Sequence, residues 1–182
     1  MEKAIKQIEE DLDLLLRDQV PGVLRKELGD GVDLRAARLI ILSLQWASVG
    51  YQSALRFAGA KFGQGIGVYL EVRELSLALE SLKKIFEKLK WGKVEIEMAL
   101  QQKKAILRIV DSLTSSGVPN INQNLCFFEE GFIEGCLEGV IKGRGSLSLM
   151  GFPGNISGVD VREARCVGQG ASACEFEINL KS

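Results

Sequence analysis

The 182-residue sequence contains no histidine. Without histidine the chain cannot build a Ser-His-Asp triad, a Cys-His nucleophile pair, a histidine-ligated zinc site or a histidine-ligated haem. A general acid or base would have to be Glu, Asp, Lys, Tyr or Cys. The composition therefore argues against a hydrolase, and an enzymatic role is the less expected one.

The sequence also lacks an excess of charge of one sign, because 23 Lys and Arg residues face 24 Asp and Glu residues, for a net charge of −1. Nucleic-acid-binding domains usually carry a basic excess, so we expect neither a nucleic acid nor an anionic membrane surface as a partner. There is no run of roughly 18 apolar residues, and the N-terminus lacks the basic-then-apolar layout of a signal peptide. We therefore expect no membrane association and a cytoplasmic location.

The length corresponds to about one domain. We divide the chain into an N-terminal amphipathic helix with a linker, residues 1–30, and a main domain, residues 31–182. In the first segment Ile5, Ile8 and Leu12 recur at helical spacing. That spacing is typical of a helix packed on its own core or of a short dimer seam, and the sequence leaves both open.

Hydrophobic periodicity predicts helices over residues 34–45, 49–62, 72–90 and 125–141. The glycine-rich run 63–67 resembles a phosphate loop only superficially. It follows a helix rather than a strand, and no Lys-Ser/Thr pair comes after it. We interpret it as a helix stop with left-handed glycines.

Three glycines recur every fourth residue in the last predicted helix, at Gly131, Gly135 and Gly139. Each glycine costs about 1 kcal/mol of helix propensity relative to alanine. We therefore expect the sheet or a second helix to pack very close to this stripe.

Alternating apolar and polar residues predict strands over 93–99, 105–113, 159–167 and 174–180. The glycine-rich segment 142–158 is expected to be a long loop that is either functional or mobile. Because the strands are segregated from the helices, the fold class is α+β: a single domain with an antiparallel four-stranded sheet of two hairpins and helices packed against it.

Four residues of the C-terminal third form a candidate metal site. Cys126 opens the last predicted helix, and Glu163, Cys166 and Cys174 lie on the last predicted hairpin. Three thiolates and a carboxylate suit tetrahedral Zn²⁺. In a regular strand Glu163 and Cys166 would point to opposite faces, so both can ligate only if the strand bulges or ends between them. The spacing alone leaves open the alternative of buried thiols beside a surface glutamate.

The chain has only four cysteines and no Cys-x-x-Cys pair. In the cytoplasm cysteines are thiols or metal ligands more often than disulfides. The fourth cysteine, Cys136, lies roughly 15 Å along the helix from Cys126. That separation is too large for one ion or one disulfide, so we expect Cys136 to be a buried thiol.

Residues 126–140 (CFFEEGFIEGCLEGV) and 161–178 (VREARCVGQGASACEFEI) resemble the 4-vinyl-reductase domain family. The family pattern has a Cys and an aromatic residue, glycines four residues apart down a helix, a strand with Glu-x-x-Cys, a glycine turn and Cys-x-Phe. The resemblance is specific over residues 104–180 and looser over 34–100.

The resemblance implies an α+β domain like the sensor modules of aromatic-responsive bacterial activators, which bind small hydrophobic or aromatic molecules. It is also similar to the fold of a vesicle-tethering subunit family. The zinc ligands of those sensors correspond here to Cys126, Glu163, Cys166 and Cys174. Segment 142–158 is longer than in the family, which leaves its role open. The sequence shows no ATPase or DNA-binding segment, so we do not expect it to be such an activator itself. It shows no nicotinamide or flavin motif, so the reductase activity is not transferred.

Three functions follow as hypotheses. The first is a sensor or carrier module for a small hydrophobic or aromatic ligand, with a structural zinc site. The second is an enzyme or accessory protein of tetrapyrrole metabolism, and the third is a homodimeric interaction or scaffold subunit. For the first, the expected pocket residues, whose alternative role is plain core packing, are Trp46, Tyr51, Phe57, Phe62, Phe127, Phe132 and Val161.

Overall fold

The computed structural model describes residues 2–3, 6–7, 10, 27, 31, 33–47, 49–99, 103–150 and 154–182. The side chains of residues 45–47 and 49 are not among the described parts. The N-terminal amphipathic helix and linker expected over residues 1–30 lie largely outside the described residues. The side chain of Trp46 lies outside them too.

The centre of the fold is a four-stranded antiparallel sheet with the strand order β1-β2-β4-β3. Its strands are β1 (Lys93–Ala99), β2 (Lys104–Val110), β3 (Gly158–Arg165) and β4 (Cys174–Lys181). β1 pairs with β2 and β3 pairs with β4, and the pairing of β2 with β4 joins the two hairpins. The two-hairpin sheet predicted from the alternation is therefore confirmed.

Alternation gives the sheet one buried and one polar face. In β2 every second residue is buried, and the same holds for β4. On the other face, Lys104 pairs with Glu177 and Arg108 pairs with Glu175, across neighbouring strands. Only one face of the sheet is thus available for helices.

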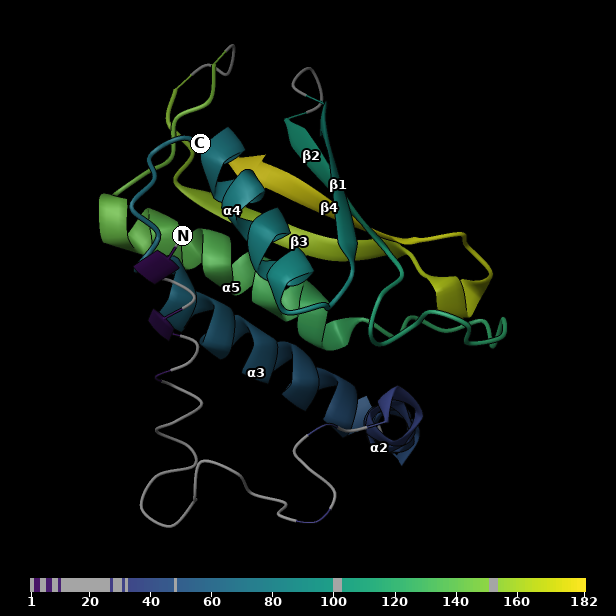
Figure 1. Ribbon diagram of the computed structural model, residues 1–182. Coiled ribbons are helices and arrows are strands. Elements are labelled where there is room, and N and C mark those ends of the chain that lie inside the picture. The colour runs from purple at the N-terminus through teal and green to yellow at the C-terminus, as the bar shows by residue number, and fades with distance from the viewer. Residues whose placement is uncertain are drawn as a thin grey trace.

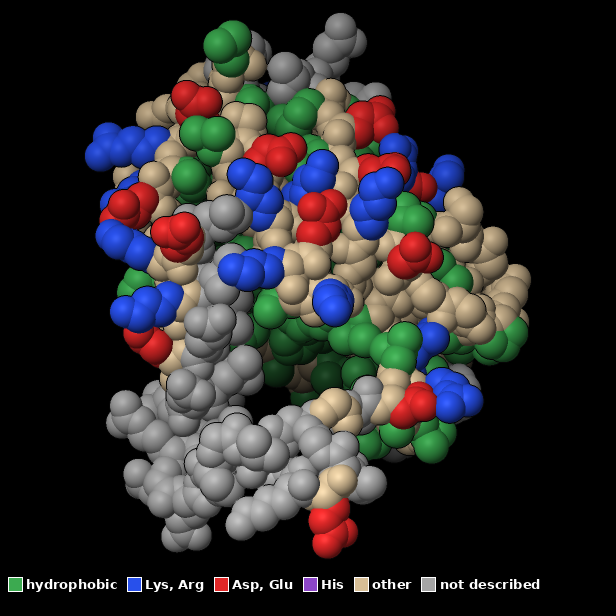
Figure 2. Space-filling model, viewed as in Figure 1, with side chains coloured by type: hydrophobic (Ala, Val, Ile, Leu, Met, Phe, Trp, Pro, Cys, Tyr) green, Lys and Arg blue, Asp and Glu red, His purple; other side chains and the backbone are tan. Residues whose placement is uncertain are grey.

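Helices α4 (Leu75–Lys88) and α5 (Phe127–Arg144) lie against the buried face of the sheet (Figure 1). Helix α3 (Val49–Gly67) packs along α5 as a further layer, and α2 (Leu34–Ala47) lies at one end of α3. Figure 2 shows basic and acidic side chains interspersed over the face that carries α4, without a large area of one sign.

The contact between α3 and α5 is made by glycines of both helices. A Cβ atom on Gly59 would lie 2.1 Å from the carbonyl oxygen of Phe128, and one on Gly135 would lie 2.0 Å from that of Ala60. Such distances exclude any side chain, so the two backbones touch. The glycines of this contact are Gly59, Gly63, Gly67, Gly131, Gly135 and Gly139. The expected close approach to the Gly131 stripe is confirmed, and its partner is a helix.

Several boundaries differ from the sequence prediction, and three of the differences have a clear physical reason. The run 63–67 does not stop a helix: α3 continues to Gly67, because its glycines serve the contact with α5. Strand β2 ends at Val110, because Asp111 adopts a positive φ of 53° and turns the chain. Helix α5 runs on to Arg144, into the segment expected as loop.

The rest of segment 142–158 is anchored at two points. Leu147 and Ile156 are buried and form an isolated antiparallel bridge. Ser148 pairs with Glu74 at the start of α4. None of the helices in the described part of the chain combines the length and hydropathy that a membrane-spanning segment needs.

Candidate functional site

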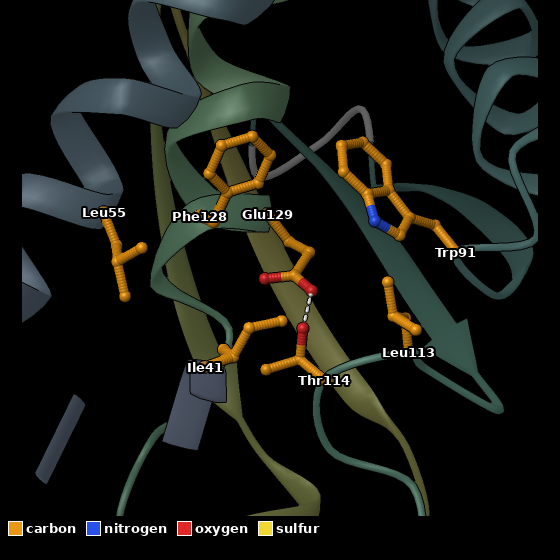
Figure 3. A pocket seen from close by; sticks show the side chains of 7 residues that line it. All are labelled: Ile41, Leu55, Trp91, Leu113, Thr114, Phe128 and Glu129. Atoms are coloured by element: carbon orange, nitrogen blue, oxygen red, sulfur yellow. Dashed lines mark hydrogen bonds between the residues drawn. The ribbon is translucent and has the colours of Figure 1, made fainter. Parts of the chain in front are cut away.

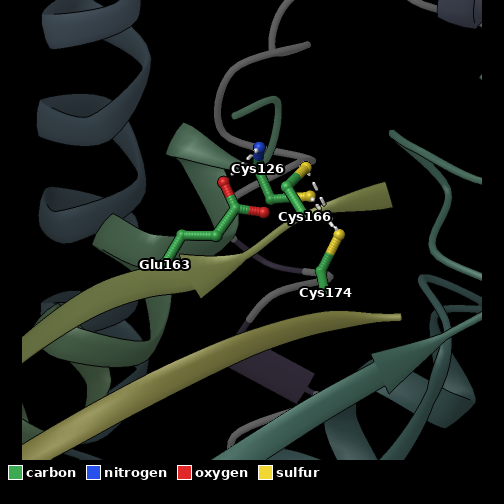
Figure 4. A group of neighbouring side chains, drawn as sticks. All are labelled: Cys126, Glu163, Cys166 and Cys174. Atoms are coloured by element: carbon green, nitrogen blue, oxygen red, sulfur yellow. Dashed lines mark hydrogen bonds between the residues drawn. The ribbon is translucent and has the colours of Figure 1, made fainter. Parts of the chain in front are cut away.

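The four predicted metal ligands come together in the structure (Figure 4). Cys126 precedes the first residue of α5, Glu163 lies in β3, Cys166 follows β3, and Cys174 begins β4. One ligand atom from each residue lies within 4.8 Å of the others, and all four residues are buried. The Sγ atom of Cys174 is 3.3 Å from that of Cys126 and 3.6 Å from that of Cys166.

A local irregularity in β3 allows both Glu163 and Cys166 to face this point. The register of β3 against β4 shifts between Glu163 and Arg165. The strand then ends, and Cys166 leads into the short 3-10 helix Val167–Gln169. The bulge required by the three-residue spacing is therefore present. We refer to Cys126, Glu163, Cys166 and Cys174 as the Cys₃Glu cluster.

The donor set of the Cys₃Glu cluster fits a zinc ion. Oε2 of Glu163 accepts a hydrogen bond of 3.2 Å from the backbone N–H of Cys126, whereas the buried Oε1 has no partner. Burial raises the pKa of Glu163 to about 8, and hydrogen bonding with the other two cysteines together with burial raises the pKa of Cys126. A divalent cation that accepts sulfur and oxygen ligands, such as Zn²⁺, would stabilise the deprotonated forms of these buried side chains.

Further polar groups hold the Cys₃Glu cluster in place. The hydroxyl of Ser115 lies 3.1 Å from Sγ of Cys174. The backbone N–H of Glu163 donates to Oε2 of Glu130 over 2.9 Å, and Oε1 of Glu130 in turn pairs with Arg56 of α3. Such outer contacts orient metal ligands. The pattern of the sequence did not single out Ser115, Glu130 or Arg56, since their roles arise from long-range contacts.

Cys136 lies apart from the Cys₃Glu cluster, in the part of α5 that contacts α3. Its thiol is fully buried and free, and burial raises its pKa to about 12. Cys136 is thus a buried thiol, as the helix spacing predicted.

A cavity of about 210 Å³ lies beside the start of α5 (Figure 3). Its walls come from α2, α3, the turn after α4, the turn after β2 and the first turn of α5. The lining residues are Ile41, Leu55, Trp91, Leu113, Thr114, Phe128 and Glu129. The backbone N–H of Leu113 donates to the carbonyl oxygen of Trp91 over 2.7 Å, which ties two of these walls together.

Among the described residues that line this cavity, Glu129 alone is ionisable near neutral pH. Its Oε1 accepts a hydrogen bond from the hydroxyl of Thr114, and its buried Oε2 has no partner (Figure 3). Burial raises the pKa of Glu129 to about 7. The polar side-chain groups among the described lining residues are the carboxyl of Glu129, the hydroxyl of Thr114 and the indole N–H of Trp91, and the other lining side chains are apolar (Figure 3).

None of the expected pocket residues whose side chains the structure describes lines this cavity. Tyr51 and Phe57 are exposed on α3, and Val161 is buried in the core. Phe132 is buried and Phe62 packs against it, with ring centroids 5.9 Å apart.

Phe127, the remaining expected residue that the structure describes, is half-buried. The next residue of the helix, Phe128, takes the lining position. Trp91, Leu113 and Thr114 were missed because they lie in turns, where no periodicity marks a buried face.

A scan for known families gives no matching family model. The chain is 26% identical over 177 residues to the uncharacterized protein MJ0150 of Methanocaldococcus jannaschii, covering 97% of this chain and 90% of that protein. It is 24% identical over 157 residues to the uncharacterized protein MJ1642 of the same organism, covering 85% and 82% of the two chains.

Among solved structures, a vinyl-4-reductase family protein from Methanocaldococcus jannaschii matches with a TM-score of 0.55 and 20% identity, over 100% of this chain and 98% of that chain. Trafficking protein particle complex subunit 3 from Naegleria fowleri, solved covalently bound to palmitic acid, matches with a TM-score of 0.50 and 15% identity, over 98% and 93%. The phenol-responsive sensory domain of the activator PoxR matches with a TM-score of 0.48 and 16% identity, over 82% and 75%. The resemblance to the 4-vinyl-reductase family is confirmed at the level of the fold.

Proposed function

We propose that the chain is a binding module for a small apolar or aromatic molecule, stabilised by a structural zinc ion. The observation that carries the proposal is the cavity of about 210 Å³, which lies between α2, α3 and the start of α5. Small-molecule sites are concave, mostly apolar and carry few polar groups, and this cavity has those properties. A protein of similar fold, the trafficking complex subunit, was solved with an apolar fatty acid.

Zinc would be held by Cys126, Glu163, Cys166 and Cys174. Bound there, it would supply a cross-link between the start of α5, the end of β3 and the start of β4. Four protein ligands leave no open position, which is typical of structural zinc sites. Because Cys126 immediately precedes α5, this cross-link would fix the position of the first turn of the helix. That turn carries Phe128 and Glu129, which line the cavity.

Thermal unfolding with an apolar probe tests the binding function. Ethylbenzene at about 100 times its dissociation constant should stabilise the zinc-loaded protein by about 2.7 kcal/mol, a rise in Tm of roughly 5–10 °C. The variant Leu55→Trp, which fills the cavity, should lose most of this rise. Leu77→Trp, on the exposed side of α4, should keep it. Absence of a shift in the wild type, or an equal shift in Leu55→Trp, contradicts the proposal.

The second candidate, a homodimeric interaction subunit, is favoured by exposed apolar side chains on α2 and α3. Leu39, Ile40 and Phe57 are each more than half exposed, at 68%, 64% and 64%. Covering such side chains with a second copy would remove apolar area from water. Analytical ultracentrifugation should show a dimer for the wild type and a monomer for Ile40→Glu. A monomeric wild type contradicts this candidate.

A further inference from the structure

The carboxyl group of Glu129 lacks a counter-charge within the cavity. Its Oε2 is buried and unpartnered, and its Oε1 is engaged only by the hydroxyl of Thr114 among the described side chains. None of the described lining residues is a lysine or an arginine. Arg38, one turn before the lining residue Ile41, donates to the backbone carbonyl oxygen of Ser116, and its buried Nε has no partner among the described residues. No cationic side chain of the described residues forms an ion pair with Glu129, so this place is open to a cationic group of a ligand.

Oε2 of Glu129 has no hydrogen-bond donor among the described residues. A buried water is retained when it makes two to four hydrogen bonds, and most of this cavity is lined by aliphatic and aromatic carbon. A buried carboxyl oxygen left without a donor is costly. A ligand group that donates a hydrogen bond there gains an interaction without displacing a well-held water.

The surroundings of Glu129 also favour a cation over a neutral donor. The side chains of Trp91 and Phe128 lie around the carboxyl group (Figure 3), and aromatic faces attract ammonium groups. A Cys₃Glu zinc centre beside Glu129 would carry a formal charge of −2, which favours a cation nearby. A hydrogen bond between an ammonium group and a carboxylate is about twice as strong as a neutral one.

We propose that this cavity binds a small apolar amine, a one-ring hydrocarbon body carrying one protonated amino group that pairs with Oε2 of Glu129. An apolar cavity of about 150 Å³ accepts benzene. The 210 Å³ measured here therefore accommodates one ring and a short aminomethyl arm. The inference rests on the proposed function of the cavity as a ligand site, and it adds the chemical class of the ligand and the residue that selects it.

Three probes of nearly the same shape test this inference by calorimetric titration of the zinc-loaded full chain. Benzylamine carries an ammonium group at neutral pH, benzyl alcohol a neutral donor, and ethylbenzene no donor. We expect benzylamine to bind about tenfold or more tightly than ethylbenzene, with benzyl alcohol between them.

Glu129→Gln keeps the size of the side chain and an acceptor oxygen but removes the charge. In this variant benzylamine should lose its advantage over benzyl alcohol, whereas Glu138→Gln, on the exposed side of α5, should keep it. Equal binding of the three probes, or an unchanged preference in Glu129→Gln, overturns the inference and leaves the proposed function standing. If no probe binds, the proposed function itself fails at this cavity.

Discussion

Two buried glutamates of the same region have one paired and one unpaired oxygen each. Glu163 accepts from the backbone of Cys126 and leaves Oε1 free among the thiols, whereas Glu129 accepts from Thr114 and leaves Oε2 free at the cavity. Burial raises the pKa of both groups, to about 8 and about 7 respectively. In the two proposals the same type of side chain has two roles, set by what would face its free oxygen: a metal for Glu163 and a ligand for Glu129.

Removing one thiol of the Cys₃Glu cluster tests the metal assignment. Cys166→Ala should abolish zinc retention, because a Cys₂Glu remainder leaves a coordination position open. Cys136→Ala should bind zinc like the wild type, since this thiol lies apart from the cluster. Zinc content of the purified proteins, measured by elemental analysis, distinguishes the two. A Cys166→Ala protein that holds as much zinc as the wild type would refute the ligand set.

The buried carboxyl of Glu129 predicts a dependence of stability on pH. The unfolded chain releases this proton near the ordinary pKa of 4.5, whereas the folded protein keeps it up to a pKa of about 7. The folded state binds more protons between these values, so the free energy of unfolding falls as pH rises through this window, by up to about 3 kcal/mol.

The variant Glu129→Gln isolates this contribution, because it removes the titrating group and leaves the Cys₃Glu cluster unchanged. Urea unfolding of both zinc-loaded proteins at pH 5 and at pH 8 should show a smaller decrease for Glu129→Gln. The comparison is made between the two proteins, because other carboxyl groups of the chain also affect stability over this pH range. Equal decreases would mean that Glu129 is not held neutral by burial.

At the scale of elements, the pairing of α3 with α5 determines where the cavity lies. The glycines allow the two backbones to touch, which sets the distance between Leu55 on α3 and Phe128 on α5.

Two positions of α3, only two residues apart, differ sharply in their surroundings. A Cβ atom on Gly63 would lie 2.3 Å from the carbonyl oxygen of Phe132, whereas one on Gly65 would meet nothing within 4 Å.

These two positions supply a matched pair of variants. Gly63→Ala should lower the free energy of unfolding by about 1–3 kcal/mol or more, because backbone atoms of α5 must move away. Gly65→Ala should raise it by about 0.5–1 kcal/mol, since alanine favours the helix. Chemical denaturation measures both changes. A Gly63→Ala protein as stable as the wild type would show that the helices can separate at little cost.

The sequence allowed the two hairpins to be predicted because alternation is a local signal. It also indicated a close contact at Gly131, Gly135 and Gly139, but not that the partner would be α3. The run 63–67 was interpreted as a helix stop because glycines usually end helices. Here they are retained inside a helix for a contact with a segment far along the chain, which no local pattern reveals.

The clustering of Cys126, Glu163, Cys166 and Cys174 was predictable for a different reason from the cavity. Their identity follows from residue chemistry and the family resemblance, and the geometry of the hairpin brings Cys166 and Cys174 together. The cavity walls come from five separate segments, and the helical phase that selects Phe128 instead of Phe127 depends on how α5 packs. Aromatic content alone therefore pointed to residues such as Phe132, which fills the core.

At the scale of the whole molecule, the Cys₃Glu cluster and the cavity share one turn of the chain. Ser115 contacts Sγ of Cys174, and Oγ of Ser112 accepts from the backbone N–H groups of Thr114 and Ser115. Between them, Leu113 and Thr114 line the cavity. A change in the position of this turn would therefore alter both the Cys₃Glu cluster and the cavity wall.

This shared turn predicts that zinc and the cavity ligand bind cooperatively. Removing zinc with a chelator should weaken the binding of whichever of benzylamine, benzyl alcohol and ethylbenzene binds most tightly, by about fivefold or more. Circular dichroism checks that the zinc-free protein stays folded. Linkage requires the probe to strengthen zinc binding by the same factor. Ser115→Ala, which removes the hydroxyl beside Cys174, should reduce both factors, and Ser116→Ala should change neither. If the probe binds equally with and without zinc, the turn joins the two sites in space without coupling them.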